Sequence, residues 1–175
     1  MTSSKKDDGG RMAEGDKPKA RAPSSIPACP AGRRHPLSGK KAKIYSDGGA
    51  RGNPGPAAIG VLVCDDKDQK FTDHGETIGE TTNNVAEYTA VVRGLTLAAE
   101  LGISEADYFL DSELVQRQLS GIYRLKAEHL KPFFTQVKEL EKKFKRVTYF
   151  HVPREHPKIK HVDRLVNLAL DHAGN

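Results

Sequence analysis

The order of the hydrophobic patterns along the chain predicts an α/β fold built on a single sheet. Three extended patterns follow one another near 43–47, 59–64 and 70–79, and helical and extended patterns alternate from there to the C-terminus. Strands joined by short turns pair antiparallel, whereas a strand reached through a helix can pair in parallel. We therefore expect an α/β sheet with an antiparallel portion, and a body of about 135 residues is ample for one hydrophobic core.

The first strand pattern ends at Asp47, and a turn rich in glycine and proline follows before the extended pattern resumes at Ile59. Glycines in such a turn leave backbone amides uncovered, so that a phosphate can approach closely beside the Asp47 carboxylate. A plain hairpin turn would use the same glycines. Taken alone, the turn leaves both interpretations open.

A helix is predicted over 84–101, because the polar residues 81–84 can cap its start and Gly102 follows its last apolar residue. Glu87 and Gly94 fall on its apolar stripe, which faces the sheet. A carboxylate on that stripe needs a partner or a path to solvent. Gly94 indicates close packing between helix and sheet, which makes the path to solvent harder.

The second half of the chain continues the alternation of strands and helices. Its patterns predict, in order, a strand over 106–111, a short helix, a long amphipathic helix over 127–145, a strand over 147–152 and a final helix over 160–173. Asp111 stands at the carboxyl end of a strand, where ligands gather in α/β sheets, although it could equally cap the short helix. Asp163 lies near the start of the last helix, where the helix dipole favours an acid in any case.

Four acidic residues thus come from four separate segments: Asp47, Glu87, Asp111 and Asp163. Carboxylates brought to one point repel one another and are costly to desolvate, so a fold tolerates them when a cation joins them. Oxygen ligands suit Mg²⁺ or Mn²⁺, and two such ions about 3.5–4 Å apart are typical of enzymes that cut phosphodiesters. The residues therefore predict a two-metal site.

Four motifs in this order resemble the type 1 ribonuclease H family. They are Asp-Gly-x-x-x-Gly-Asn-Pro-Gly-Pro at 47–56, Thr-Thr-Asn-Asn-x-x-Glu at 81–87, Asp-Ser-Glu-Leu-Val at 111–115 and Val-Pro-Arg-Glu at 152–155, before Asp163. The resemblance runs from Lys43 to Asp171 and implies a ribonuclease H-like mixed five-stranded sheet flanked by helices. It also implies two Mg²⁺ or Mn²⁺ ions on the four carboxylates, and Asp47 is the best candidate to bridge both ions. The activity that it implies is hydrolysis of the RNA strand of RNA–DNA hybrids to 5′-phosphate and 3′-hydroxyl ends.

The chain resembles the shorter subclass of that family, because residues 121–126 join two helices directly, without a basic protrusion. Asn53, Asn83 and Asn84 match family positions that contact the hybrid in its minor groove, where RNA displays its 2′-hydroxyls. Thr82 matches a family position that holds a phosphate of the DNA strand. Ordinary roles in turns and helix caps would also account for these four residues.

Two further positions lie shortly before the last acid. His156 is in the loop where some family members carry a histidine that assists proton transfer or product release, a role that Arg154 or Glu155 could also take. Ile159 departs from the family pattern, which often has a polar residue four positions before the last acid. The resemblance therefore leaves the surroundings of Asp163 to be established.

The net charge of +5 lies entirely in residues 1–40, which hold nine Lys and Arg against four Asp and Glu. We expect 1–40 to be a disordered basic tail that either attracts phosphates or keeps the protein soluble, and 41–175 to be the catalytic domain. No segment has the composition of a signal peptide or a membrane span, and two cysteines are too few for a disulfide framework. The expectation is a cytoplasmic monomer with no membrane partner.

The leading hypothesis is a metal-dependent endonuclease on RNA–DNA hybrids, with double-stranded RNA left open as a second substrate. One alternative is a non-catalytic protein of the same fold that binds hybrids or double-stranded RNA, but binding alone gains nothing from the carboxylates. Another is a different two-metal nuclease, such as an exonuclease, which the motifs at 52–55 and 82–84 disfavour. Because metal binds only as the acids lose protons, activity should rise toward alkaline pH.

Overall fold

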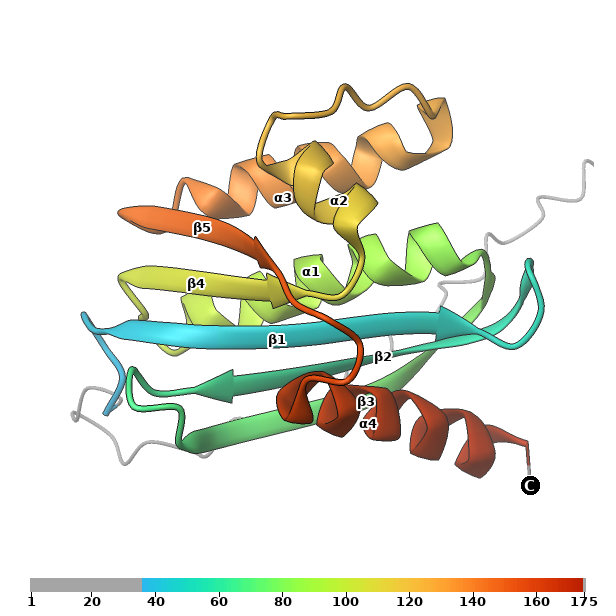
Figure 1. The fold of residues 1–175 in the computed structure, drawn as a ribbon, viewed down its shortest axis with the longest axis horizontal. Helices are drawn as coiled ribbons and strands as arrows, with labels where there is room; N and C mark the ends of the chain where they lie inside the picture. The colour runs from blue at the N-terminus through green and yellow to red at the C-terminus, as the bar shows by residue number, and fades with distance from the viewer. Residues whose placement is uncertain (1–35, 175) are drawn as a thin grey trace, which may run out of the picture.

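The chain forms one mixed sheet of five strands in the order β3-β2-β1-β4-β5 (Figure 1). A computed structural model describes residues 36–174. The strands are β1 Lys41–Ala50, β2 Gly55–Cys64, β3 Lys70–Thr81, β4 Glu105–Leu110 and β5 Arg146–His151. β2 pairs antiparallel with β1 and β3, whereas β4 pairs in parallel with β1 and β5. The predicted five-stranded sheet with an antiparallel portion is confirmed.

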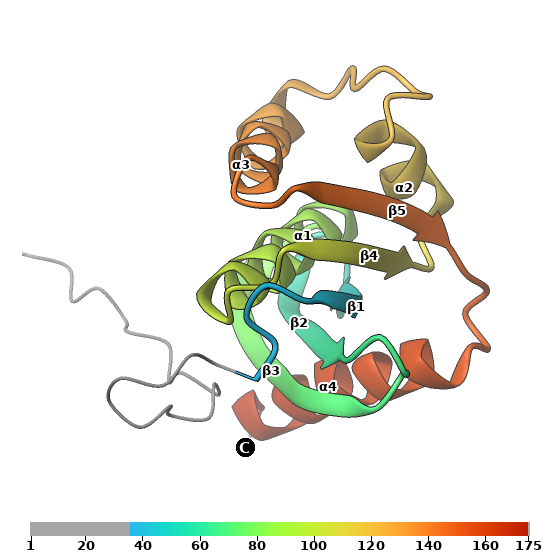
Figure 2. The ribbon, with the colours of Figure 1, turned by 90° about the vertical axis from the view of Figure 1, so that its left-hand side faces the viewer.

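Helices cover both faces of this sheet (Figure 2). They are α1 Asn83–Glu100, α2 Glu113–Leu119, α3 Lys131–Glu141 and α4 Pro157–Ala173, with a short 3₁₀ helix, η1, at Glu128–Leu130. α1 packs on one face against β1 and β2, and α3 packs against α1. α4 packs on the opposite face, against β1, β2 and β3.

The two faces carry hydrophobic cores of different size. The face under α1 has one large continuous cluster, which includes Ile44, Leu95 and Tyr108. The face under α4 has two smaller clusters, one of them around Tyr45. Because side chains alternate along a strand, Ile44 points toward α1 while Tyr45 points toward α4. Asp47 lies two residues beyond Tyr45 and so also faces α4, with only 8% of its surface exposed.

β1 is longer than the sequence predicts. It does not end at Asp47 but continues to Ala50, because β2 pairs with it as far as Ala50 and Ala57. The parallel pairing with β4 ends earlier, at Tyr45 and Phe109. Asp47 therefore lies just beyond the parallel ladder, at the point where a ligand site is expected in such a sheet.

The helix predicted over 127–145 is wrong at both ends. Its first residues form η1, and α3 ends at Glu141. Pro132 stands in the first turn of α3, where its missing N–H leaves no hydrogen bond unmade. Phe144 is buried in the cluster under α1, so the chain turns inward before β5 rather than continuing as an exposed helix.

The predicted tail, 1–40, lies largely outside the described residues, which begin at Pro36. Leu37 is 5% exposed and belongs to the cluster under α1, and the Gly39 amide donates a hydrogen bond to the Gly102 carbonyl at 2.8 Å. The packed body thus begins a few residues before Lys41. Within 36–174, no helix combines the length and the apolar character needed to cross a membrane.

Candidate active site

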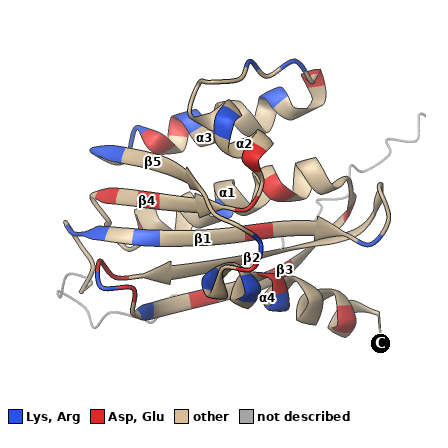
Figure 3. Cartoon of the chain, viewed as in Figure 1, with Lys and Arg blue, Asp and Glu red and all other residues tan. Residues whose placement is uncertain are grey.

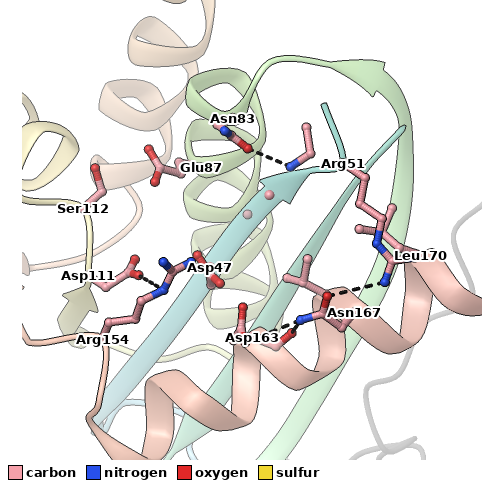
Figure 4. A pocket seen from close by; sticks show the side chains of 14 residues that line it. Asp47, Arg51, Asn83, Glu87, Asp111, Ser112, Arg154, Asp163, Asn167 and Leu170 are labelled. Atoms are coloured by element: carbon pink, nitrogen blue, oxygen red, sulfur yellow. Dashed lines mark hydrogen bonds and ion pairs between the residues drawn. The ribbon is translucent and has the colours of Figure 1, made fainter. Parts of the chain in front are cut away.

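A cavity of about 420 Å³ opens beside the middle of β1 and is lined by all four predicted carboxylates, Asp47, Glu87, Asp111 and Asp163 (Figure 4). Asp47 comes from β1, Glu87 from the first turns of α1, Asp111 from the end of β4 and Asp163 from α4. The tertiary structure thus brings together four acids that are separated by up to 116 positions in the sequence.

A glycine on β1 allows Glu87 to approach Asp47. A Cβ atom at Gly48 would collide with the Ala86 carbonyl, so the backbone of α1 lies directly against the strand at this point. Ala86 immediately precedes Glu87, and Gly48 immediately follows Asp47. The close contact between the two backbones therefore allows the Asp47 and Glu87 side chains to line the same cavity.

A second glycine has the same effect for α4 on the other face. Gly60 of β2 is paired with Asp47, and a Cβ atom there would collide with the Val162 carbonyl of α4. The next residue of α4 is Asp163. The lack of a side chain at Gly60 lets α4 lie close enough to the sheet for Asp163 to line the cavity.

Asp111 follows the last residue of β4, and the next residue, Ser112, starts α2. The Ser112 hydroxyl accepts a hydrogen bond from the Val115 amide at 3.3 Å and is the N-cap of that helix. The N-cap of α2 is therefore Ser112 and not Asp111. The Arg154 guanidinium lies 4.0 Å from the Asp111 carboxylate.

Burial and mutual repulsion change the protonation of these acids. Burial, followed by the charges of the other three carboxylates, raises the pKa of Asp47 to about 8. Burial and the neighbouring Asp111 charge raise the pKa of Glu87 to about 7, although a hydrogen bond from Ser112 and the charge of Arg154 act in the opposite direction. Burial also raises the pKa of Asp111. The cavity therefore carries negative charge that the surrounding protein compensates only in part.

The donor set fits hard divalent cations, because it offers carboxylate oxygens and its charge is compensated only in part. Among residues 36–174, however, no group of three or more His, Cys, Asp or Glu side chains is already arranged to hold a metal ion.

The predicted substrate residues lie around the start of α1. Asn83 lines the cavity, its side-chain oxygen accepts a hydrogen bond from the Ala50 amide at 2.8 Å, and its own amide donates to the Asn53 side chain at 3.2 Å. Thr82 is the N-cap of α1 and accepts from the Val85 amide at 3.3 Å. Asn53, Thr82 and Asn84 do not line the cavity. Their contacts with substrate remain a prediction.

His156 lies apart from the carboxylate cavity. Its Nδ1 accepts a hydrogen bond from the Lys158 amide at 3.1 Å, which makes it the N-cap of α4, and its ring stacks on Tyr45 with centroids 5.5 Å apart. Ile159, the departure from the family pattern, is 1% exposed and belongs to the same cluster as Tyr45. The structure gives both residues a role in attaching α4, and a part for His156 in proton transfer stays a prediction.

Sequence reasoning missed Asn167, which also lines the cavity. Its side-chain amide donates to the Asp163 carbonyl at 3.0 Å and lies 3.4 Å from the Asp163 carboxylate. The separation of four residues on a helix was a signal that could have identified it, because such residues are neighbours on the helix surface. Arg51 was missed as well, because an arginine in a glycine-rich turn has no pattern that distinguishes it from a solvated surface residue.

The fold and the site together define the class of this protein. Residues 45–169 match a family model described as reverse transcriptase-like. Ribonuclease HI of Halobacterium salinarum is 37% identical to the chain over 138 residues, which are 79% of this chain and 68% of that protein. The chain belongs to the ribonuclease H family.

Other relatives share most of the described body. Rv2228c of Mycobacterium tuberculosis, a bifunctional protein, is 41% identical over 134 residues, which are 76% of this chain and 36% of that protein. The chain therefore spans about a third of that relative's length. The solved N-terminal RNase H domain of Rv2228c matches with a TM-score of 0.73 and 40% identity over 77% of this chain and 96% of that domain.

A further solved structure is that of LC11-RNase H1, isolated from compost, in complex with an RNA/DNA hybrid. It matches with a TM-score of 0.70 and 41% identity, over 77% of this chain and 99% of that chain.

Proposed function

We propose that this protein is a metal-dependent endonuclease that hydrolyses the RNA strand of RNA–DNA hybrids and leaves 5′-phosphate and 3′-hydroxyl ends. The observation that carries the proposal is the cavity lined by Asp47, Glu87, Asp111 and Asp163. The match to LC11-RNase H1, whose structure contains an RNA/DNA hybrid, supports the choice of substrate.

We assign the four carboxylates as ligands of two Mg²⁺ or Mn²⁺ ions, with Asp47 shared between them because it lies centrally and is the most buried of the four. Such ions, when bound, would lower the pKa of an attacking water and neutralise charge on the leaving 3′ oxygen. A buried acid that binds no cation costs folding free energy, which is a structural reason to expect a cation here.

The residues around the carboxylates control their charge and position. The Ser112 hydroxyl and the Arg154 guanidinium both favour the ionised form of Glu87, which is the form that binds metal. Asn167 contacts both the carbonyl and the carboxylate of Asp163 and so restricts its side chain. Asn83 fixes the end of β1 by accepting from the Ala50 amide.

Substrate recognition is assigned to the start of α1 and the neighbouring turn. Asn53, Asn83 and Asn84 would hydrogen-bond in the minor groove, where the 2′-hydroxyls distinguish RNA from DNA, and Thr82 would hold a phosphate of the DNA strand. The hydrogen bond from the Asn83 amide to the Asn53 side chain connects the turn to the start of the helix. We further propose a monomer that acts in the cytoplasm, with double-stranded RNA as a second substrate to be tested.

The test is cleavage of an end-labelled RNA annealed to DNA, in the presence of Mg²⁺, Mn²⁺ or EDTA, with RNA–RNA and DNA–DNA duplexes as controls. Internal cuts confined to the RNA of the hybrid, and lost with EDTA or with Asp111→Asn, are expected. Tight binding of the hybrid without a cut in either metal would instead support a non-catalytic binding protein. Cuts only from an end of the RNA would support an exonuclease.

A further inference from the structure

Two of the described residues that line the carboxylate cavity carry a positive charge, Arg51 and Arg154. They lie on opposite sides of it (Figure 4). Arg154 is beside Asp111, whereas Arg51 is beside Asn167 and Leu170 of α4. A nucleic-acid strand that reaches the carboxylates passes this rim, and cationic groups there are places where the protein can attract its phosphates.

The backbone that carries Arg51 is held in one conformation. Its amide donates a hydrogen bond to the Pro56 carbonyl at 2.8 Å, which closes the turn between β1 and β2. A Cβ atom at Gly55 would collide with the Arg51 carbonyl, so the turn is too tight for any other residue there. Gly52 has a φ of 101°, a conformation that L side chains rarely adopt. The position of Arg51 at the rim is therefore fixed by the turn and does not depend on its side-chain contacts.

Among residues 36–174, the hydrogen bonds and the ion pair of the Arg51 side chain all involve Nη2. Its Nη2 donates to the Asp171 carboxylate at 2.6 Å and lies 3.5 Å from the Asn167 side-chain oxygen. The side chains of Arg51 and Asp171 are 49% and 58% exposed, and ion pairs this exposed contribute little to stability. The guanidinium group has five N–H donors, and a contact at Nη2 leaves the others available to an anion. The pair thus orients Arg51 along α4 without saturating it.

We propose that Arg51 binds a phosphate of the cleaved strand adjacent to the phosphate at the carboxylates, from a position at the cavity rim that the turn between β1 and β2 fixes. The inference rests on the proposed function and adds a substrate contact to it. A guanidinium group suits this role because its planar fork matches two phosphate oxygens. Asn167 contacts Arg51 on one side and Asp163 on the other, so the same side chain connects the phosphate contact to the metal site.

The test is hybrid binding rather than cleavage, so that it can be read separately from the activity. The dissociation constant of a fluorescent RNA–DNA hybrid would be measured with Mg²⁺ at several salt concentrations, for Asp111→Asn and for the same chain with Arg51→Ala added. We expect about 5- to 20-fold weaker binding, and a slope of log Kd against log salt that is smaller by about 1, as for the loss of one phosphate contact.

Two control variants separate a phosphate contact from a structural effect. Arg146→Ala removes an arginine of similar exposure, paired with Glu105 at 3.2 Å at the start of β5, and should change neither quantity. Asp171→Asn breaks the ion pair but keeps the charge of Arg51, and should not weaken binding. Arg51→Lys should restore part of the affinity and the full slope.

Three results would overturn the inference: binding by Arg51→Ala within 2-fold of its parent, weaker binding with an unchanged salt slope, or an equal loss in Asp171→Asn. If Asp111→Asn itself bound no hybrid at low salt, the inference and the proposed substrate would fall together. Cleavage of the hybrid by the wild-type chain, combined with unchanged binding by Arg51→Ala, would remove only the assignment of Arg51.

Discussion

The two faces of the sheet contribute to the carboxylate cavity in different ways. Glu87 comes from α1, which lies over one large continuous core, whereas Asp163 comes from α4, which lies over two small clusters. Each helix touches the sheet at a glycine, Gly48 under α1 and Gly60 under α4. Both faces therefore use the same device for close approach, but the α1 face has much more buried surface to keep it in place.

The consequence is a difference in how firmly the two acids are held. Glu87 is positioned by the core of the whole domain, and it cannot move without disturbing residues such as Tyr88 and Val91, which are fully buried. Asp163 is positioned by the smaller clusters and by the local contact with Asn167. Changes to the α1 face should therefore affect folding first, and changes to the α4 face should affect the site first.

Charges on the surface do not show this difference, because acidic and basic residues are interleaved on the exposed helices (Figure 3). The main asymmetry is the carboxylate cavity, whose lining contains four acids, Asp47, Glu87, Asp111 and Asp163.

The largest effect is expected for Asp47→Asn, because Asp47 contributes to the site from the centre. Hybrid cleavage should fall by about 1,000-fold or more, since the shared metal ligand is lost. Stability should change in the opposite direction. The folded-state pKa of Asp47, about 8, lies above its ordinary value, so ionisation costs folding free energy progressively as the pH rises toward 8.

Differential scanning fluorimetry at pH 8 in EDTA measures the stability part of that prediction. Asp47→Asn should be more stable than wild type by about 1–3 kcal/mol, because the buried charge is gone. The difference should shrink toward pH 4, where the wild-type carboxyl is protonated. If the variant were less stable than wild type at pH 8, the Asp47 carboxylate would instead stabilise the fold through its contacts within the protein.

Alanine at the two contact glycines compares the faces directly. Gly48→Ala should destabilise by about 3 kcal/mol or more, because the new methyl group meets the Ala86 carbonyl of a helix that its core prevents from moving. Gly60→Ala should destabilise by about 1–2 kcal/mol, because α4 can shift outward. Gly49→Ala is the matched control, since its Cβ would lie 3.7 Å from Val166 in ordinary contact.

Urea unfolding gives these stabilities, and Mn²⁺ titration of the folded variants gives the effect on the site. Gly60→Ala should lose about 10-fold or more in Mn²⁺ affinity while it remains folded, because Asp163 moves away with α4. Equal destabilisation by the two substitutions, with metal affinity intact in Gly60→Ala, would contradict the proposed difference between the faces.

Metal binding should depend on pH through Asp47 and Glu87, the two acids of the cavity whose pKa values are raised most. Burial holds the pKa of Glu87 at about 7 and that of Asp47 at about 8, so both are largely protonated at pH 6 in the absence of a cation. Because a metal ion must displace these protons, Mg²⁺ affinity should rise by about 10-fold or more between pH 6 and 8.

Isothermal titration calorimetry in buffers of different ionisation enthalpy measures the protons released on binding. Glu87→Gln should release fewer protons than wild type at pH 7, whereas an exposed acid away from the cavity, as in Glu139→Gln, should leave the release unchanged. An affinity that is flat from pH 6 to 9 would mean that these carboxylates are ionised without the metal.

The smallest effect is expected for Asn84→Ala, at an exposed position in the first turn of α1. Stability should stay within about 0.5 kcal/mol, as for a surface substitution. The KM for hybrid cleavage should rise by about 3- to 10-fold from the loss of one polar contact, with metal affinity unchanged. Asn83→Ala is the comparison, because it also removes the hydrogen bond from Ala50 and should lower stability.

Steady-state kinetics and a Mn²⁺ titration distinguish these outcomes. An equal loss of hybrid cleavage and metal binding in Asn84→Ala would point to misfolding of the start of α1 rather than to a substrate contact.

The fold could be predicted far more completely than the details of the site. The alternation of apolar residues and the positions of turns gave the five strands and their mixed pairing, because these patterns are local. The length of β1 could not be predicted, since its last residues are extended only through pairing with β2. The predicted end of α3 at residue 145 was wrong, because the chain leaves the helix after Glu141 and buries Phe144, although the helical pattern continues.

The sequence alone indicated which four carboxylates belong together, because Asp47, Glu87, Asp111 and Asp163 stand in or after four motifs that follow one another in the order of the type 1 ribonuclease H family. Only the tertiary structure decided how they meet. The contacts of Gly48 with Ala86 and of Gly60 with Val162 join segments distant in the chain, and nothing local specifies them. The same holds for Arg51, which the turn between β1 and β2 places at the cavity, and for His156, which stacks on Tyr45 of β1 away from it. The sequence specifies which side chains are present, whereas the distances between them, on which the site depends, arise from packing.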